Sequence, residues 1–466
     1  MSEHDPTQCS IEIPDDKMIF DWITHVDAND TPQPSSSAAK IPRVPSMLSE
    51  KHNYEKYFAP QAVSIGPYHF GEPKLQEVEE LKAIIVRNLF LHDQEALISL
   101  YKKLGEEEMM KDLRSFYEQD STTKYCDKVF TKMMLLDSCF VFYFIYEVFI
   151  WESWFSLGVF TSFDQVYFVC GDLFLLENQI PFKLLAVVMS FLKTYNNNFN
   201  KIQELIHHEI NMLGSSDQKR TLLKSILCIR SYQRSGQQRL ESELTGDNAP
   251  DHLLHLLYLT HKPEYVVFAT DYSKKNKEWN YHSNNFPTVN QLLDVGIHFK
   301  PCHPISSNNV RFSKGWFEFS AAVQLPPITL LGHTKPVLLN LIAYETRFCK
   351  DAWFASYVCL LRSLIGNHED VRVLKKAGVL QHDFGTDKEV ADFLKETATD
   401  VAPHNSTCMK LMDDIQSHYE GWSNTPISEL RREYRKSPWK FISLLGASIA
   451  LFLTAVQTYF AVWSRK

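Results

Sequence analysis

The C-terminal end of this sequence constrains the structure most, because it carries a long run without charge. Residues Phe441–Trp463 contain no Asp, Glu, Lys, Arg or His. At about 1.5 Å rise per residue, a helix over this run reaches across the ~30 Å hydrocarbon core of a bilayer. The sequence therefore predicts one C-terminal transmembrane helix. The residues expected to anchor it in the lipid are Phe441, Leu445, Leu451, Leu453, Tyr459 and Trp463.

Basic residues on the two sides of this run predict its orientation. Two of them, Arg465 and Lys466, follow the run, and a larger group precedes it. The preceding basic residues are Arg431, Arg432, Arg435, Lys436 and Lys440. By the positive-inside rule this asymmetry favours a cytosolic body. We therefore expect a tail-anchored, single-pass protein of the plasma membrane, with the lipid bilayer as its partner through residues 441–463.

Composition places the rest of the chain among ordinary globular proteins. With 466 residues, 44% of them hydrophobic, it can bury a real core. The net charge is −8 and the basic residues are scattered outside the C-terminal region, which argues against nucleic acid as a partner. The nine cysteines contain no CxxC pair, so we expect buried thiols in a reducing compartment.

Local patterns divide the chain into a leader, a large helical body and the C-terminal run. Residues 1–39 are expected to form a disordered acidic leader, and 40–430 a helical domain with variable stretches at 196–250 and 270–287. The segment 431–440 is the basic juxtamembrane part. A helical period covers Leu75–Phe90, and apolar and polar residues alternate around a turn in Val310–Phe319. The fold class predicted is mainly α, with a small β-hairpin.

Several short motifs resemble a known plant family. They are Ile41-Pro-Arg-Val-Pro45, Val63-Ser-Ile-Gly-Pro-Tyr-His69, Asp172-Leu-Phe-Leu-Leu-Glu-Asn-Gln-Ile-Pro-Phe182 and Asn340-Leu-Ile-Ala-Tyr-Glu345. In this order, and followed by an apolar C-terminal run, they resemble the family called domain of unknown function 247. The chain has Phe70 where the family pattern has a second His, so it resembles a divergent member.

The resemblance implies a plant membrane-associated protein without an established enzymatic activity. Some grass members are linked to pollen-side self-incompatibility, which implies a recognition or signalling role with an unknown protein partner. The motif residues of interest are Arg43, Pro45, Gly66, Pro67, Tyr68, His69, Asp137, Asp172, Glu177, Asn178, Gln179 and Pro181. We expect them to be structural, with residues 177–179 capping backbone groups at an elbow between helices. The alternative is a membrane-bound enzyme with a polar site near Asp172, Glu177 and Gln179.

Motifs for common chemistry are missing from the sequence. It contains no GxSxG nucleophile elbow, Walker loop, GxGxxG fingerprint or HExxH. The histidine-containing groups that we considered as metal ligands are His252 with His255 and His261, His207–Glu209, and His298 with Cys302 and His303. None has the spacing of a zinc site. We therefore predict no catalytic residues, no metal and no cofactor.

Overall fold

The structure is a computed structural model of the chain. It describes residues 39–145, 163–192, 250–261, 286–302, 310–315, 320–330, 334–349, 352–397, 406–432 with single gaps at 424, 427 and 430, and 438–463. The predicted leader lies outside the described residues except for residue 39. The same holds for the variable stretch 196–250 except for Pro250, and for nearly all of 270–287.

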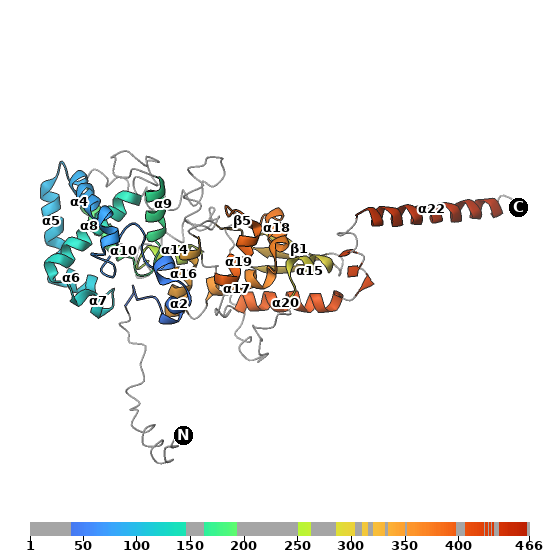
Figure 1. Cartoon of the computed structure of the whole chain (residues 1–466), viewed down its shortest axis with the longest axis horizontal. Coiled ribbons are helices and arrows are strands. Elements are labelled where there is room, and N and C mark those ends of the chain that lie inside the picture. Colours follow the sequence, from blue (N-terminus) through green and yellow to red (C-terminus); the bar gives the residue numbers. More distant parts are fainter. Residues whose placement is uncertain are drawn as a thin grey trace, which may run out of the picture.

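The N-terminal half of the body is helical and is organised around one long buried helix, α8 (Figure 1). Helices α4, α5 and α10 contact α8. The elements of this half are α2 (Ser46–Lys51), α3 (Tyr54–Tyr57), the 3-10 helix η1 (Pro73–Leu75), α4 (Gln76–Leu89), α5 (Gln94–Leu104), α6 (Glu107–Arg114), α7 (Gln119–Thr123), α8 (Asp127–Ile145), α9 (Phe163–Asp172), α10 (Phe182–Phe191) and α14 (Leu253–His261).

The C-terminal half combines helices with two small sheets. Its helices are α15 (Val289–Asp294), α16 (Thr334–Phe348), α17 (Trp353–Leu364), α18 (His368–Lys376), α19 (Asp387–Thr397) and α20 (Ser406–Trp422). Its strands are β1 (Ile297–Pro301), β2 (Arg311–Lys314), β3 (Ala321–Leu325), β4 (Ile328–Leu330) and β5 (Leu380–His382). The sheet order is β1-β3-β2, and β4 pairs in parallel with β5.

The predicted β-hairpin region contains one antiparallel pair, in a different place from the one expected. Strand β2 pairs with β3, so that Lys314 lies opposite Ala321, whereas residues 316–319 lie outside the described part of the chain. Strand β1 then adds to β3 in parallel, with Ile297 opposite Ala321. The alternation in the sequence revealed the β2 strand but not the parallel partner, because that partner comes from outside the alternating segment.

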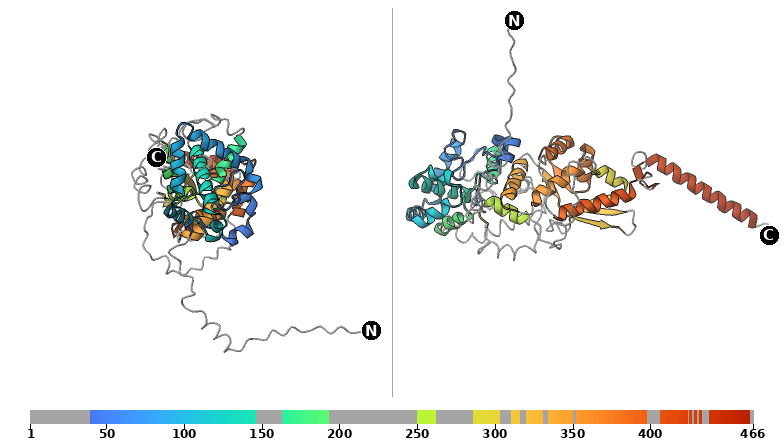
Figure 2. Two further views of the ribbon diagram at one scale, coloured as in Figure 1. Left: turned by 90° about the vertical axis from the view of Figure 1, so that its left-hand side faces the viewer. Right: turned by 90° about the horizontal axis from the view of Figure 1, so that it is seen from below.

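One contiguous apolar core joins the two halves. Helix α16 links them, because it contacts α3 and α14 on one side and α17 and α19 on the other (Figure 2). Its central residues Leu339, Leu341 and Ala343 are fully buried. Burial on several sides explains why α16 reads as an almost continuous apolar run rather than as a one-sided stripe.

Helix α22 (Pro438–Trp463) corrects the prediction made from the C-terminal run. It leaves the body and extends away from it (Figures 1 and 2). Among the described residues, no helix combines the length and the apolar character that are needed to cross a bilayer. The predicted transmembrane helix, the tail-anchored single-pass topology and the plasma-membrane location are therefore wrong. The absence of charge misled the prediction, because the run also contains uncharged polar residues, among them Ser443, Thr454, Gln457 and Thr458, which reduce its apolar character.

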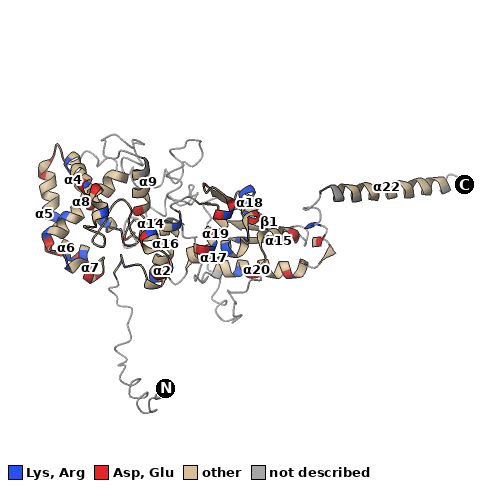
Figure 3. Cartoon of the chain, viewed as in Figure 1, with Lys and Arg blue, Asp and Glu red and all other residues tan. Residues whose placement is uncertain are grey.

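The structure places most of the residues that were predicted to anchor the chain on the surface of α22. Leu445, Leu451, Leu453, Tyr459 and Trp463 are exposed, and the side chain of Phe441 lies outside the described residues. The described side chains of α22 include no charged group, in contrast to the body (Figure 3). Of the predicted basic cluster, Arg431 and Arg432 precede α22, Arg435 and Lys436 lie outside the described residues, and Lys440 falls within the helix.

Candidate functional site: a buried polar elbow

The Asp172–Pro181 motif forms the elbow between α9 and α10, as its sequence predicts. Pro181 caps α10 with φ −56°, and the chain enters the helix directly after it. Polar side chains of the motif point into the protein, since Asp172, Glu177, Asn178 and Gln179 are all at most 3% exposed. A buried polar group is costly unless it is hydrogen-bonded, so the partners of these four side chains define what the elbow does.

Asp172 binds the backbone of the segment that follows α3. Its carboxylate accepts hydrogen bonds from the backbone N–H groups of Gln61, Ala62 and Val63, with distances between 2.7 and 3.1 Å. Burial raises the pKa of Asp172 to about 7, and the three N–H donors oppose that shift because they favour the ionised form. The carboxylate therefore fixes a turn that has no regular secondary structure of its own.

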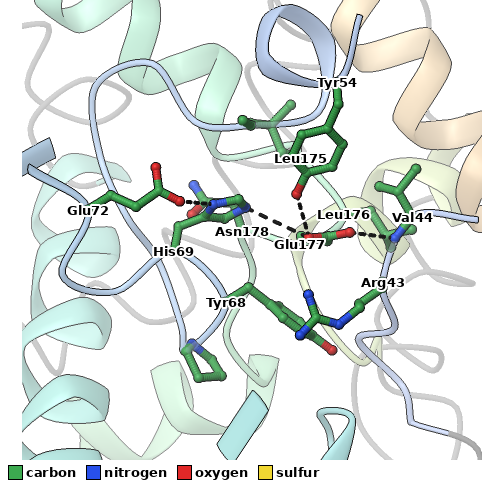
Figure 4. A network of polar contacts seen from close by, with 12 residues as sticks. Arg43, Val44, Tyr54, Tyr68, His69, Glu72, Leu175, Leu176, Glu177 and Asn178 are labelled. Atoms are coloured by element: carbon green, nitrogen blue, oxygen red, sulfur yellow. Dashed lines mark hydrogen bonds and ion pairs between the residues drawn. The ribbon is translucent and has the colours of Figure 1, made fainter. Parts of the chain in front are cut away.

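Glu177 binds the N-terminal strand-like segment and α3 together (Figure 4). Its carboxylate accepts from the backbone N–H of Val44 at 2.7 Å and from the hydroxyl of Tyr54 at 2.7 Å. Burial and the neighbouring Glu177 raise the pKa of Tyr54 above its usual range, so Tyr54 stays a donor. His69 lies on the other side, with Nε2 3.9 Å from the Glu177 carboxylate and Nδ1 2.6 Å from Glu72.

The two amides of the motif complete the elbow. The Asn178 side chain accepts from the backbone N–H of Ile65 and donates to the carbonyls of Val63 and Asp172. The Gln179 side chain donates to the carbonyls of Leu173 and Leu175 and accepts from the N–H of Leu254 at the start of α14. Each amide therefore uses both its N–H donors and its carbonyl acceptor inside the protein. These bonds account for the polar residues of the motif as parts of the fold.

Gly66 is required where the incoming segment passes over the elbow. Its φ is +79°, and a Cβ at this position would lie 2.6 Å from the carbonyl oxygen of Gln179. Only glycine adopts this conformation without strain and permits so close an approach. The Gly66 N–H donates to Asp137 of α8 at 2.8 Å, so the turn is joined to the central helix. Pro67 follows Gly66 directly, and its carbonyl accepts from the hydroxyl of Tyr125.

A fully buried lysine, which the sequence analysis did not single out, supports the same turn. Lys82 of α4 is 0% exposed, and its Nζ lies 2.6 Å from Asp137 and 2.5 Å from the carbonyl oxygen of Ser64. It also contacts Glu79. Burial raises the pKa of Asp137, and the ammonium group of Lys82 opposes this shift. Asp137, predicted as a motif residue, therefore acts in an ion pair that holds the Ser64–Gly66 turn.

Asn340, which the sequence analysis quoted as part of a motif but did not propose as a site residue, connects the elbow to α16. Its side chain accepts from the N–H of Leu176 and donates to the carbonyls of Tyr57 and Pro336. Asn340 is 0% exposed and links parts of the chain that are far apart in sequence. The signal that could have revealed it is a lone amide inside an apolar helical run, because such an amide needs buried partners.

The outer edge of the elbow is formed by the first motif, and it is half-exposed. Arg43 lies over the ring of Tyr68, pairs with Asp120 at 3.1 Å and has Glu118 at 3.5 Å. The hydroxyl of Tyr68 donates to the carbonyl of Ile41 at 2.6 Å. Pro45 caps α2, and its carbonyl accepts the first hydrogen bonds of that helix. Exposed ion pairs of this kind contribute little to stability. The buried carboxylates of Asp172 and Glu177 therefore stabilise the elbow more than Arg43 does.

The histidines considered as metal ligands have other roles where the structure describes them. His252 is 0% exposed at the start of α14, and its Nδ1 accepts from the N–H of His255. His298 lies on β1 and Cys302 just after it, whereas the side chain of His261, residues 207–209 and His303 lie outside the described residues. Within the described ranges, no three His, Cys, Asp or Glu side chains gather as a metal site would require.

Replacing Tyr54 by phenylalanine tests the contact with Glu177. The variant removes the O–H donor and leaves one lone-pair direction of a buried carboxylate without its partner. We expect the free energy of unfolding to fall by about 1–2 kcal/mol, as measured by urea denaturation. Tyr101→Phe on the exposed face of α5 is the matched control, and it should change stability by less than about 0.5 kcal/mol. Equal effects of the two substitutions would contradict this description of the elbow.

The comparisons with known proteins agree with the motifs. The model of the family DUF247, described as plant protein of unknown function, matches residues 41–453. The chain belongs to this family. The match starts at Ile41, whose backbone N–H bonds to Phe116, and it includes every motif residue of the elbow.

Two relatives of the DUF247 chain come from Arabidopsis thaliana. UPF0481 protein At3g47200 is 25% identical over 446 residues, which cover 88% of this chain and 83% of that protein. Putative UPF0481 protein At3g02645 is 30% identical over 180 residues, covering 38% of this chain and 33% of that protein. Neither name states an activity, a membrane or self-incompatibility. No solved structure matches the chain.

Proposed function

We propose that this DUF247 protein acts by binding another protein in recognition or signalling, and that its most distinctive motif holds the binding body in shape. The observation that carries the proposal is the use of the elbow's polar groups. Asp172, Glu177, Asn178 and Gln179 all bind backbone groups or Tyr54, at positions that are at most 3% exposed. A catalytic carboxylate needs access to a substrate proton or carbon, and these carboxylates are covered.

The same contacts explain what the elbow contributes to a binding protein. Single side chains tie the segment 41–66 to α8 and α16, and Gln179 ties the elbow itself to the start of α14. Apart from the short helices α2 and α3, the segment has little regular structure, so without these bonds it would not present a fixed surface. A body with a fixed surface is the requirement for recognition, because rigid binding sites lose less conformational entropy on association.

The variant Glu177→Gln separates this proposal from an enzyme with its site at the elbow. Glutamine keeps an acceptor for the Val44 N–H, and its amide donates to the Tyr54 hydroxyl oxygen, so the fold should persist. In proximity labelling with the full chain in plant tissue, we expect the wild type and Glu177→Gln to label the same proteins. A purified partner from that set should bind both forms with equal affinity and at a fixed stoichiometry.

The opposing result concerns small molecules. If the wild type converts a compound in plant extract, and Glu177→Gln loses that conversion while its melting temperature stays within a few degrees, the elbow is an active site. His69 beside Glu177 and Glu72 would then supply the acid–base pair, and the binding proposal would be overturned. The melting temperature shows whether a loss of conversion or of binding in Glu177→Gln comes from unfolding.

A further inference from the structure

The small sheet and helix α20 bring basic and imidazole side chains close to one another. Lys314 of β2 lies opposite Ala321 of β3, and Ala321 lies opposite Ile297 of β1. Paired residues share a face of a sheet, so Lys314 is on the face that buries Ile297 and Ala321. Helix α20 contacts β2. The ring of Phe312, on the same face as Lys314, packs against His418 of α20, with the ring centroids 5.6 Å apart.

His418 has an unusual environment for a polar side chain. It is 7% exposed, and the ring centroids of Phe312 and Trp422 lie 5.6 and 6.4 Å from the centroid of its imidazole. The Nε2 atom of His418 is buried, and among the residues that the structure describes it has no hydrogen-bond partner. Buried polar atoms in proteins are nearly always hydrogen-bonded. Nε2 is therefore available to a ligand that reaches this position.

Positive charges act on this histidine and on a second one on β1. Burial lowers the pKa of His418, and the positive charges of Lys314 and Arg431 lower it further. Burial also lowers the pKa of His298, and Arg431 and Lys300 add to that shift. Because Arg431 acts on both histidines, these side chains form one electrostatic group. We call it the α20 basic group, and its members are His298, Lys300, Lys314, His418 and Arg431.

Two carboxylates of α20 lie at the edge of the α20 basic group. Burial raises the pKa of Asp414, which is four residues before His418, and Lys410 and Lys314 oppose the shift. Asp413 adds to the shift. Strands β1, β2 and β3 contain no Asp or Glu. The lysines and the arginine around this position therefore outnumber these two carboxylates, and such a local excess of positive charge attracts anions.

We propose that the α20 basic group binds the phosphate group of a small soluble ligand, with Nε2 of His418 as the buried donor and Lys314 and Arg431 beside it. A phosphate monoester carries nearly two negative charges and three acceptor oxygens, which match ammonium, guanidinium and imidazole donors. A bound anion also favours the charged imidazole, in which both ring nitrogens donate. Because Nε2 is buried, the ligand presents its phosphate as a terminal group.

The test is a calorimetric titration of the full chain with inorganic phosphate near neutral pH, at an ionic strength held constant with sodium chloride. We expect saturable binding of one phosphate per chain. Acetate carries a single negative charge and two acceptor oxygens, so it should bind about 10-fold more weakly or less. Vesicles of phosphatidylcholine with phosphatidic acid present the same group on a lipid, and we expect them not to bind the chain.

Two variants assign the binding to these side chains. Lys314→Met removes a cation from an exposed position and should weaken phosphate binding by about 5-fold. Lys128→Met, the same change at an exposed position at the start of α8, is the matched control and should leave binding as it is in the wild type. His418→Phe keeps an aromatic ring but removes Nε2, and it should weaken binding by about 10-fold or more. Melting temperatures without phosphate show that the variants are folded.

Three results would overturn the proposal. The first is the absence of saturable phosphate binding by the wild type. The second is equal weakening by Lys314→Met and Lys128→Met, which would mean that net charge alone attracts the anion. The third is binding to the phosphatidic acid vesicles without binding of inorganic phosphate, which would assign the phosphate to a lipid. None of these results bears on the elbow, so the recognition proposal is tested separately.

Discussion

Replacing Lys82 by methionine is expected to lower the free energy of unfolding by about 3–5 kcal/mol. Lys82 is completely buried, and its ammonium group lies between Asp137, Glu79 and the carbonyl oxygen of Ser64. Methionine fills a similar volume but leaves Asp137 buried without its counter-ion. Urea denaturation at pH 7, followed by circular dichroism, measures the loss.

The double variant Lys82→Met/Asp137→Asn is the matched control. Asparagine keeps an acceptor for the Gly66 N–H and removes the unpaired charge. We expect the double variant to be more stable than Lys82→Met alone, because the cost of the single change is the buried carboxylate rather than a lost contact. If the free energy of unfolding of Lys82→Met lies within about 1 kcal/mol of the wild-type value, Asp137 is already neutral in the folded state. The ion pair would then not hold the Ser64–Gly66 turn.

The sequence predicted the elbow better than it predicted the lysine beneath it. Pro181 after a run of polar residues indicated a helix start and a turn before it, which is local information. Lys82 lies four residues after Val78 and three before Ile85, on the buried stripe of α4. The helical spacing alone places Lys82 on the apolar face of α4. A lysine on such a face can be identified as buried only when its acidic partner is known. Asp137 is 55 residues further along the chain.

The errors have two different physical causes. The small β1-β3-β2 sheet depends on pairing between segments that are not neighbours, and side-chain alternation in one segment carries no information about its partner. The C-terminal run was interpreted from its lack of charge alone. A run without charge can still fall short of the apolar character that a membrane span needs, because uncharged polar residues such as Ser443, Thr454 and Gln457 lower it.

Acidification from about pH 6.5 to about pH 3 is expected to lower the free energy of unfolding through His252 by about 3–5 kcal/mol in total. Burial lowers the pKa of His252 to about 3, and His255 adds to this shift, while Asp251 opposes it and Lys40 acts in both directions. The folded state therefore keeps the imidazole neutral, and the unfolded state takes up a proton. Stability from this group is complete above pH 6.5 and is lost as the pH falls.

The variant His252→Asn isolates this effect from the other titrating groups. Asparagine retains an acceptor for the His255 N–H that Nδ1 of His252 receives, but it does not titrate. Asp172 acts in the opposite sense, because its pKa is raised to about 7 and its contribution is lost as the pH rises. Only the difference between wild type and variant therefore reports on His252. We expect the difference in the free energy of unfolding between wild type and variant to change by about 2 kcal/mol between pH 7 and pH 5. The change favours the variant at pH 5.

An exposed histidine provides the comparison that makes this result specific. His92 lies on the surface after α4. His92→Asn makes the same substitution at an exposed site, so its curve serves as the baseline against which the effect of His252→Asn is measured. If His252→Asn and His92→Asn give parallel curves between pH 5 and pH 7, water reaches His252 at the start of α14. Helix α14 would then pack less tightly against the elbow than the hydrogen bond from the Leu254 N–H to the Gln179 side chain indicates.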